Sequence, residues 1–375
     1  MKSTDALFLL VRAGLFGHTE GAESLLPDGV EWAEVYQLAK EQSVVGLAAA
    51  GMEKLQAEWV RVHGSLLVPK PWVLRFTSTT LKIEQRNLAA NALIAKLIDR
   101  MHRKGIHALL VKGQCLAMNY EKPLWRACGD VDLLLSEADY QRAKDYLLPF
   151  ASRVMPEHGY KKHFGLVISG WMVELHGSLR CGFSTRVDRE LDKVCRDTFP
   201  DGSGRSWMDG DVEVPLLGRE HDVLYVFAHF LNHFYKAGVG VRQICDWCRL
   251  LWVSQGAIDL GMLEARLRSM GLMSEWRAFG RYAVDYLGMP EAAMPFLSDD
   301  DKWKRKAEQI QSFILKTGNM GHNRRKRKAE KPSFLSRKLG SSWQRMGDLA
   351  NHFLIFPLDT LRFLPRIVLT GARQK

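Results

Sequence analysis

The chain has 375 residues, of which 46% are hydrophobic and 25% charged, as in globular proteins. This length exceeds the usual size of one hydrophobic core, so we expect more than one structural unit. No apolar run reaches the roughly 18 residues that cross a bilayer, which excludes an integral membrane protein. Thirteen Lys and Arg against three acidic residues lie in 322–375, and this segment carries nearly all of the net charge of +11.

Residues 1–104 are predicted to form a helical N-terminal region. Apolar side chains recur there at three- and four-residue steps, and we expect helices over 6–16, 32–55 and 71–104. The apolar start of the chain contains Arg12 and lacks a small-residue cleavage site, which predicts a cytoplasmic protein. The six cysteines are scattered along the chain, and this favours reduced thiols over a disulfide framework.

Residues 105–217 are predicted to form an α+β unit with a small sheet. The expected strands are 108–111, 129–135, and two strands within 163–179 that turn at Ser169-Gly170. Helices are expected over 114–120 and 137–148. This unit therefore has the mixed pattern of strands and helices that the flanking regions lack.

Residues 218–321 return to a helical pattern and are predicted to close one side of a cleft. The helices are expected over 220–237, 240–254, 259–269, 274–287 and 299–318.

Residues 322–375 are predicted to be a basic linker and an amphipathic tail. The run Arg324–Lys328 is typical of a solvated linker, and a last helical stretch over 333–370 is expected to break at Pro357 and Pro365.

Three acidic residues indicate a metal site. Asp130 and Asp132 are two apart on a strand, so both side chains point to one face, about 6.5–7 Å apart along the chain. Glu174 alternates with aliphatic residues on a later strand and is the candidate third carboxylate. Carboxylates suit hard divalent ions such as Mg²⁺ or Mn²⁺, which support phosphoryl transfer in pairs about 3.5–4 Å apart. Removal of either aspartate is expected to leave the fold intact, because it relieves repulsion between like charges.

Residues before the aspartates are typical of phosphate binding. Lys112 supplies positive charge, and Gly113 lets the backbone approach a ligand where a strand meets a helix. Arg126 is suited to bind a phosphate through two parallel hydrogen bonds.

This pattern resembles the uncharacterised nucleotidyltransferase family of the DNA polymerase β-like superfamily. The resemblance is close over 106–135 and looser around Glu174 and in 229–251, and it covers 1–104 and the basic tail weakly or not at all. One departure is Lys112-Gly113-Gln114, where the superfamily usually has Gly-Ser or Gly-Gly. The residues that carry the resemblance are Leu110 to Gly113, Tyr120, Leu124, Arg126 and Gly129 to Leu134.

The resemblance implies a polymerase β-type nucleotidyltransferase fold with Mg²⁺ or Mn²⁺ held by Asp130, Asp132 and Glu174. It places an NTP near Lys112 and Gly113. Further candidates for nucleotide binding are Arg126, Gly129, Arg242 and Asp246. Arg242 and Asp246 are also four residues apart on a helix, so a simple ion pair within that helix is the alternative.

The predicted reaction is transfer of a nucleoside monophosphate from an NTP to an acceptor hydroxyl or phosphate that the sequence does not name. A metal-dependent glycosyltransferase that uses a nucleotide-sugar is one alternative, because Asp-x-Asp also occurs there. A non-catalytic nucleotide-binding module is the other.

A zinc site is a further hypothesis. His229 and His233 are four residues apart, as in zinc proteases, but Phe230 stands where the general-base glutamate is needed, which excludes that class. Cys245 and Cys248 follow at a spacing that a structural zinc site allows. Their apolar surroundings favour buried hydrophobic cysteines instead.

The tail combines the basic run with apolar, Phe-rich residues over 349–369. This pattern favours peripheral contact with an anionic membrane, such as the inner membrane surface, and a lipid-linked or cell-envelope acceptor. Nucleic acid is a less suitable partner because aromatic residues are not interleaved with the basic run. The alternative is that the apolar residues pack on the helical domain.

Overall fold

The computed structural model describes residues 1–25, 29–201, 205–236, 238–319 and 349–372. Its fold is a mixed α+β arrangement with one small mixed sheet among many helices, as predicted. The expected basic run at 324–328 lies outside the described residues.

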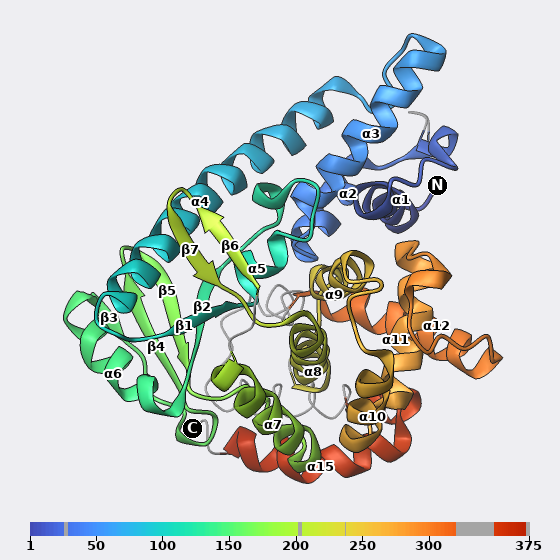
Figure 1. Ribbon diagram of the computed structural model, residues 1–375. Helices are drawn as coiled ribbons and strands as arrows, with labels where there is room; N and C mark the ends of the chain where they lie inside the picture. Colours follow the sequence, from blue (N-terminus) through green and yellow to red (C-terminus); the bar gives the residue numbers. More distant parts are fainter. Residues whose placement is uncertain (26–28, 202–204, 237, 320–348, 373–375) are drawn as a thin grey trace, which may run out of the picture.

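The N-terminal helices pack against one another at one end of the molecule (Figure 1). They are α1 (Ser3–Phe16), α2 (Trp32–Glu41) and α3 (Val45–His63). Gly14 and Gly51 let α1 and α3 cross closely, since a Cβ on Gly51 would lie 1.8 Å from the Leu10 carbonyl oxygen.

The single helix expected over 32–55 is wrong, because the chain turns between α2 and α3. Ser43 has a φ of 58°, in the left-handed region. The Gln42 side chain is buried there, accepts a hydrogen bond from the Val241 backbone N–H at 3.0 Å and donates to the Ile314 carbonyl. These contacts with distant segments end the helix at a place where the local pattern would continue it.

A five-stranded sheet forms the centre of the α+β unit, in the order β1-β2-β5-β4-β3. β2 and β5 are parallel, whereas the other neighbouring pairs are antiparallel. The β4–β5 hairpin turns at Ser169 and Gly170, both with positive φ, as predicted. The strands are β1 (Ala108–Val111), β2 (Asp130–Leu135), β3 (Arg153–Val154), β4 (His163–Ile168) and β5 (Trp171–His176).

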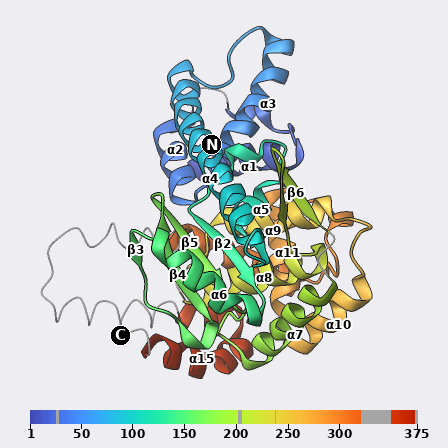
Figure 2. The same ribbon diagram turned by 60° about the vertical axis from the view of Figure 1, so that its left-hand side comes forward.

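The two faces of the sheet differ in chemistry. Val131, Leu133 and Leu135 of β2 pack with one end of the long helix α4 (Lys70–His102) in a hydrophobic cluster. Figure 2 shows α4 running from the N-terminal helices to the sheet. Asp130 and Asp132 alternate with these aliphatic residues and therefore lie on the opposite face.

Several elements connect the sheet to the helices. They are α5 (Gly113–Ala117), α6 (Glu137–Leu147), α7 (Thr185–Asp201), β6 (Ser206–Asp209) and β7 (Val212–Pro215). The sequence pattern indicated neither α7 nor the β6–β7 hairpin. Short 3-10 turns are Ala22–Leu25, Pro123–Trp125, Leu148–Phe150, Gly159–Lys161 and Glu291–Ala293.

The C-terminal helices surround α8, which lies in their middle (Figure 1). Their positions agree with the predicted ranges to within two residues. They are α8 (Arg219–Lys236), α9 (Val241–Val253), α10 (Leu260–Met270), α11 (Met273–Leu287) and α12 (Asp301–Thr317). Side chains of these helices and of α1–α3 share one hydrophobic cluster, so the two helical regions pack together beside the sheet.

The last helix, α15 (Pro357–Ala372), continues through Pro365, so the break expected there is wrong. Arg362 donates to the carbonyls of Met270 and Gly271, and Arg366 bonds to Asp188. These anchors hold the helix on both sides of the proline, although the ring removes an N–H donor and crowds the Leu361 carbonyl.

Glu275 of α11 makes the stability of the fold depend on pH. The pKa of Glu275 is raised from its ordinary 4.5 to about 8, mainly by burial and to a smaller extent by the nearby Asp359. The native chain therefore keeps a proton that the unfolded chain releases between these values, and stability falls as pH rises from about 4.5 to 8. We expect Glu275→Gln to reduce this slope and to raise the free energy of unfolding at pH 8.

Denaturant unfolding at a series of pH values measures this effect, with Glu58→Gln on an exposed helix surface as the control. An unchanged slope in Glu275→Gln would contradict the assignment.

Candidate active site

Three carboxylates converge on the polar face of the sheet. Asp132 of β2 lies opposite Glu174 of β5 in the parallel register, and Asp130 is one pleat away on the same face. One oxygen from each of the three lies within 4.8 Å of the others. The structure therefore brings the predicted acidic residues together, in a group of the size that could hold a divalent ion.

The carboxylates differ in their surroundings. The pKa of Asp130 is raised above its ordinary value. The larger cause is the nearby Asp132 carboxylate, and the next is burial. Asp132 is only 1% exposed, and its Oδ1 lies 2.6 Å from Lys112 Nζ and 2.8 Å from His176 Nε2. Asp130 thus experiences repulsion, whereas the Oδ1 atom of Asp132 pairs with two neighbouring donors.

Lys112 sits in the sharp turn from β1 into α5. Its φ of 56° is in the left-handed region, and the turn directs the side chain to Asp132. Burial alone would lower the pKa of Lys112, but Asp132 and the other anionic groups raise it well above its ordinary value. The ammonium is therefore charged and lies at the carboxylates, and its predicted contact with a triphosphate stays a prediction.

The two glycines have different environments. Gly113 has a φ of 40°, and a Cβ there would lie 3.2 Å from the Asp130 carbonyl oxygen, so the turn itself requires a small residue. Gly129 is exposed with open space beside it. Their role in nucleotide binding stays a prediction, and α5 has only five residues, fewer than expected.

Arg126 and Asp246 form a buried ion pair between the loop before β2 and α9. Arg126 Nε and Nη2 donate to the two Asp246 oxygens at 2.8 and 2.6 Å. Tyr120 also donates to Asp246, at 2.8 Å. The forked phosphate contact expected of Arg126 is thus made to a carboxylate instead, and the partner of Asp246 is Arg126 rather than Arg242.

The same loop has further anchors. Asn87 of α4 donates to the carbonyls of Leu124 and Arg126, both at 2.7 Å, and Arg242 donates to the Ala127 carbonyl at 2.6 Å. The Arg242 Nε is buried and makes no hydrogen bond within the described part of the chain. Arg242 therefore both holds the loop that leads to Asp130 and retains a free donor at the cleft.

Two neutral histidines of α8 face the carboxylates. His229 and His233 have their Nε2 atoms 3.0 Å apart. Burial, and then the positive charge of Lys112, lower the pKa of both, to about 4 for His233 and well below 6.5 for His229. Both rings are therefore neutral at pH 7.

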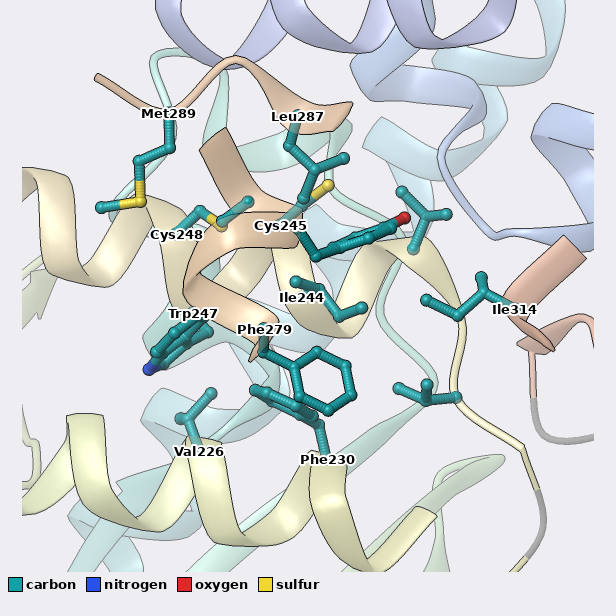
Figure 3. Packing of buried hydrophobic residues seen from close by; sticks show 14 of the residues in the cluster. Val226, Phe230, Ile244, Cys245, Trp247, Cys248, Phe279, Leu287, Met289 and Ile314 are labelled. Atoms are coloured by element: carbon teal, nitrogen blue, oxygen red, sulfur yellow. The ribbon is translucent and has the colours of Figure 1, made fainter. Parts of the chain in front are cut away.

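The cysteines proposed for zinc lie elsewhere. Cys245 and Cys248 are buried among the apolar side chains of α8, α9 and α11 (Figure 3). Neither belongs to a group of potential metal ligands found in the described ranges. The hydrophobic interpretation of these cysteines is therefore the one that their surroundings support.

Two histidines were missed as site residues. His176 alternates with Glu174 on β5, and His163 of β4 pairs with His176 in the hairpin register. The His163 Nε2 lies 3.1 Å from Glu174 Oε2. The turn at Ser169-Gly170 was a sufficient signal, because a two-residue turn fixes which residues lie opposite each other.

The three carboxylates line a cleft of about 200 Å³ between the sheet and helices α8 and α9. Every predicted site residue except Gly129 lines it. The residues at the cleft are Lys112, Gly113, Leu116, Arg126, Asp130, Asp132, Glu174, Val226, His229, Phe230, His233, Arg242, Gln243 and Asp246.

A mixed sheet that presents three clustered carboxylates beside a lysine is the arrangement expected of a nucleotidyltransferase. The chain belongs to the uncharacterised nucleotidyltransferase family, whose model matches residues 28–288. The match includes α2–α4 and α8–α11, and thus more of the chain than the motif around Asp130. Comparisons with curated proteins and with solved structures give no match.

Proposed function

We propose that this protein transfers a nucleoside monophosphate from an NTP to an acceptor hydroxyl or phosphate, on a domain of the polymerase β type. The observation that carries the proposal is the convergence of Asp130, Asp132 and Glu174 on adjacent strands, next to Lys112. Three carboxylates repel one another unless cations compensate them. This repulsion is seen at Asp130, whose pKa is raised by the Asp132 carboxylate and by burial. The family membership supports the same reaction.

Asp130, Asp132 and Glu174 would hold Mg²⁺ or Mn²⁺, because carboxylate oxygens suit hard divalent ions. When bound, such ions neutralise the charge that develops on the transferred phosphoryl group. Lys112, beside Asp132, and the free Arg242 Nε would bind phosphate oxygens in the cleft. Neutral His229, which lines the cleft, would contact the acceptor as a hydrogen-bonding group.

The cleft of about 200 Å³ is smaller than the roughly 300–1,000 Å³ of pockets that enclose a whole ligand. We therefore propose that it takes the phosphates, while the base and sugar extend past the exposed Gly129.

Two alternatives predict different products. A glycosyltransferase would release a nucleoside diphosphate from a nucleotide-sugar, and a binding module would release nothing. The third carboxylate and Lys112 favour nucleotidyl transfer over glycosyl transfer, because neither feature is needed to hold a nucleotide-sugar diphosphate. Release of pyrophosphate distinguishes transfer from simple nucleotide binding.

The test is to incubate the full-length chain with each NTP labelled at the α-phosphate, with Mg²⁺ and a cell lysate. We expect the label to move to an acceptor with release of pyrophosphate, and Glu174→Gln to reduce turnover more than NTP affinity. Binding without pyrophosphate release would support the module. Release of a nucleoside diphosphate from nucleotide-sugars would support the glycosyltransferase.

Lys112→Ala should weaken binding of an NTP by about 10- to 100-fold and of the matching NMP by much less. A hydrogen bond to a charged group contributes about 1.5–3 kcal/mol, and only the NTP carries β- and γ-phosphates. Titration calorimetry with both ligands measures this. Lys144→Ala, which removes a similarly buried lysine of a different ion pair, is the control. Equal losses for the two ligands would place the lysine away from those phosphates.

The tail is proposed to contact an anionic membrane, and this would bring the enzyme to a lipid-linked acceptor at the inner membrane surface. Ile355, Phe356 and Phe363 are buried in the cluster formed by the helices. This part of the tail therefore packs on the helical domain, as the alternative interpretation predicted. Leu354, Leu358 and Leu361 are instead exposed, at 71%, 78% and 55%. Leu358 and Leu361 are three residues apart on one face of α15, and Leu354 precedes that helix. No helix among the described residues is long and apolar enough to span a bilayer.

Replacement of Leu354, Leu358 and Leu361 together by serine should reduce flotation of the full-length protein with anionic liposomes at least several-fold. These side chains are exposed, so the fold should tolerate the change. The control replaces two exposed leucines of α4, Leu81 and Leu88, by serine. Equal flotation of both variants and the parent protein would remove the support for membrane contact.

A further inference from the structure

A second group of potential ligands lies beside the three carboxylates, on the β4–β5 hairpin. His163 and His176 are direct partners in the register, and their rings stack with centroids 4.8 Å apart and planes 18° from parallel. The Nε2 atoms lie 3.1 and 3.7 Å from the same atom, Glu174 Oε2. Ligand atoms of these three residues all lie within 4.8 Å of one another.

The chemistry of this group differs from that of the aspartates. Two imidazole nitrogens and one carboxylate suit zinc and related transition metals, whereas all-oxygen groups suit Mg²⁺. Metal–nitrogen and metal–oxygen bonds of about 2.0–2.2 Å place ligands roughly 3–4 Å apart, close to the spacing seen here. His163 Nε2 is also a buried atom that makes no hydrogen bond within the described ranges, although Glu174 is near.

We propose that His163, Glu174 and His176 form a binding site for a zinc-like divalent transition metal, separate from the Mg²⁺ site and joined to it through Glu174. Both histidines are on paired strands of the hairpin, so the ligands are held by rigid elements rather than by a loop.

Glu174 would then have two tasks. It completes the carboxylate group of the proposed transfer reaction, and it links that group to the nitrogen-rich site. The alternative is that the imidazoles only compensate the charge of Glu174, in which case they hold no ion.

Metal binding to the full-length protein tests this without any nucleotide, so its failure leaves the proposed transfer reaction untouched. The chain is freed of metal with a chelator and titrated with Co²⁺ or Zn²⁺ in excess Mg²⁺. We expect about one tightly bound ion per chain and, for Co²⁺, visible absorption bands typical of low-coordinate nitrogen and oxygen ligation.

His163→Ala and His176→Ala should each weaken this binding at least tenfold. His163 is partly exposed, so its replacement should be tolerated by the fold, and circular dichroism checks both variants. His158→Ala is the matched control, because its ring stacks on that of His163 at 6.2 Å but lies outside the group. Asp130→Asn should also retain the transition metal.

Three results would overturn the proposal. They are absence of Co²⁺ or Zn²⁺ binding to the parent protein in Mg²⁺, undiminished binding by folded His163→Ala, and loss of binding on replacement of His229 or His233 instead.

Discussion

Asp130→Asn should reduce nucleotidyl transfer at least about 10³-fold, and leave the free energy of unfolding unchanged or raise it. Removal of the carboxylate takes away an oxygen ligand of the proposed ion, whose stabilisation of the transition state contributes several kcal/mol. It also relieves the repulsion from Asp132 that raises the pKa of Asp130. Pyrophosphate release and denaturant unfolding, measured on the same preparation, test the two parts together.

Asp132→Asn should reduce transfer equally but also destabilise the fold, by about 3–5 kcal/mol. Asp132 is buried, and Lys112 Nζ and His176 Nε2 both lie on its Oδ1. The change leaves a buried lysine without its anion. The sequence-based expectation that either aspartate can be removed without cost therefore applies to Asp130 alone. Activity retained in a folded Asp130 variant, or equal stabilities of the two variants, would contradict this division.

Asp246→Ala should lower the free energy of unfolding by about 3–5 kcal/mol, because it breaks a buried ion pair. Its partner Arg126 has a side chain only 6% exposed, so the guanidinium would remain charged and buried without an anion. Arg126→Met should cost a similar amount. The double variant Arg126→Met/Asp246→Leu should regain most of the loss, because neither charge is then left buried alone.

A double-mutant cycle by denaturant unfolding measures this coupling. Glu264→Ala, which breaks an exposed ion pair with Arg268, is the control and should cost no more than about 0.5 kcal/mol. Additive losses for Arg126 and Asp246 would show that the pair is not the source of the stability.

The same pair connects stability to activity. Arg126 lies four residues before Asp130, and its contacts with Asp246 and Asn87 fix the loop that leads into β2. We therefore expect the double variant to fold but to transfer nucleotide more slowly than the parent, because the loop that leads to the aspartates loses the anchor that Arg126 and Asp246 provide.

Much of the carboxylate group could be predicted from the sequence. The two-residue period of strands put Asp130 and Asp132 on one face, and the alternation in β5 put Glu174 on a single face with His176. The hairpin turn at Ser169-Gly170 was also correct. Local periodicity is sufficient for such features, since it depends only on backbone geometry within one strand or hairpin.

Contacts between distant segments could not be predicted in this way. Arg126 had the residue type of a phosphate ligand, but its partner Asp246 lies 120 positions away on α9. The end of α2 depends on hydrogen bonds from Gln42 to segments around 241 and 314.

The sequence by itself thus determined β1, β2, β4 and β5, most helices, and the carboxylates that point to nucleotidyl transfer. Only the tertiary structure decided that Lys112 lies on Asp132, that Arg126 is neutralised by Asp246, and that His163 reaches Glu174. The reason is physical: a charged side chain binds the nearest available counter-charge. Which one is nearest depends on how β-strands and helices pack, not on their spacing along the chain.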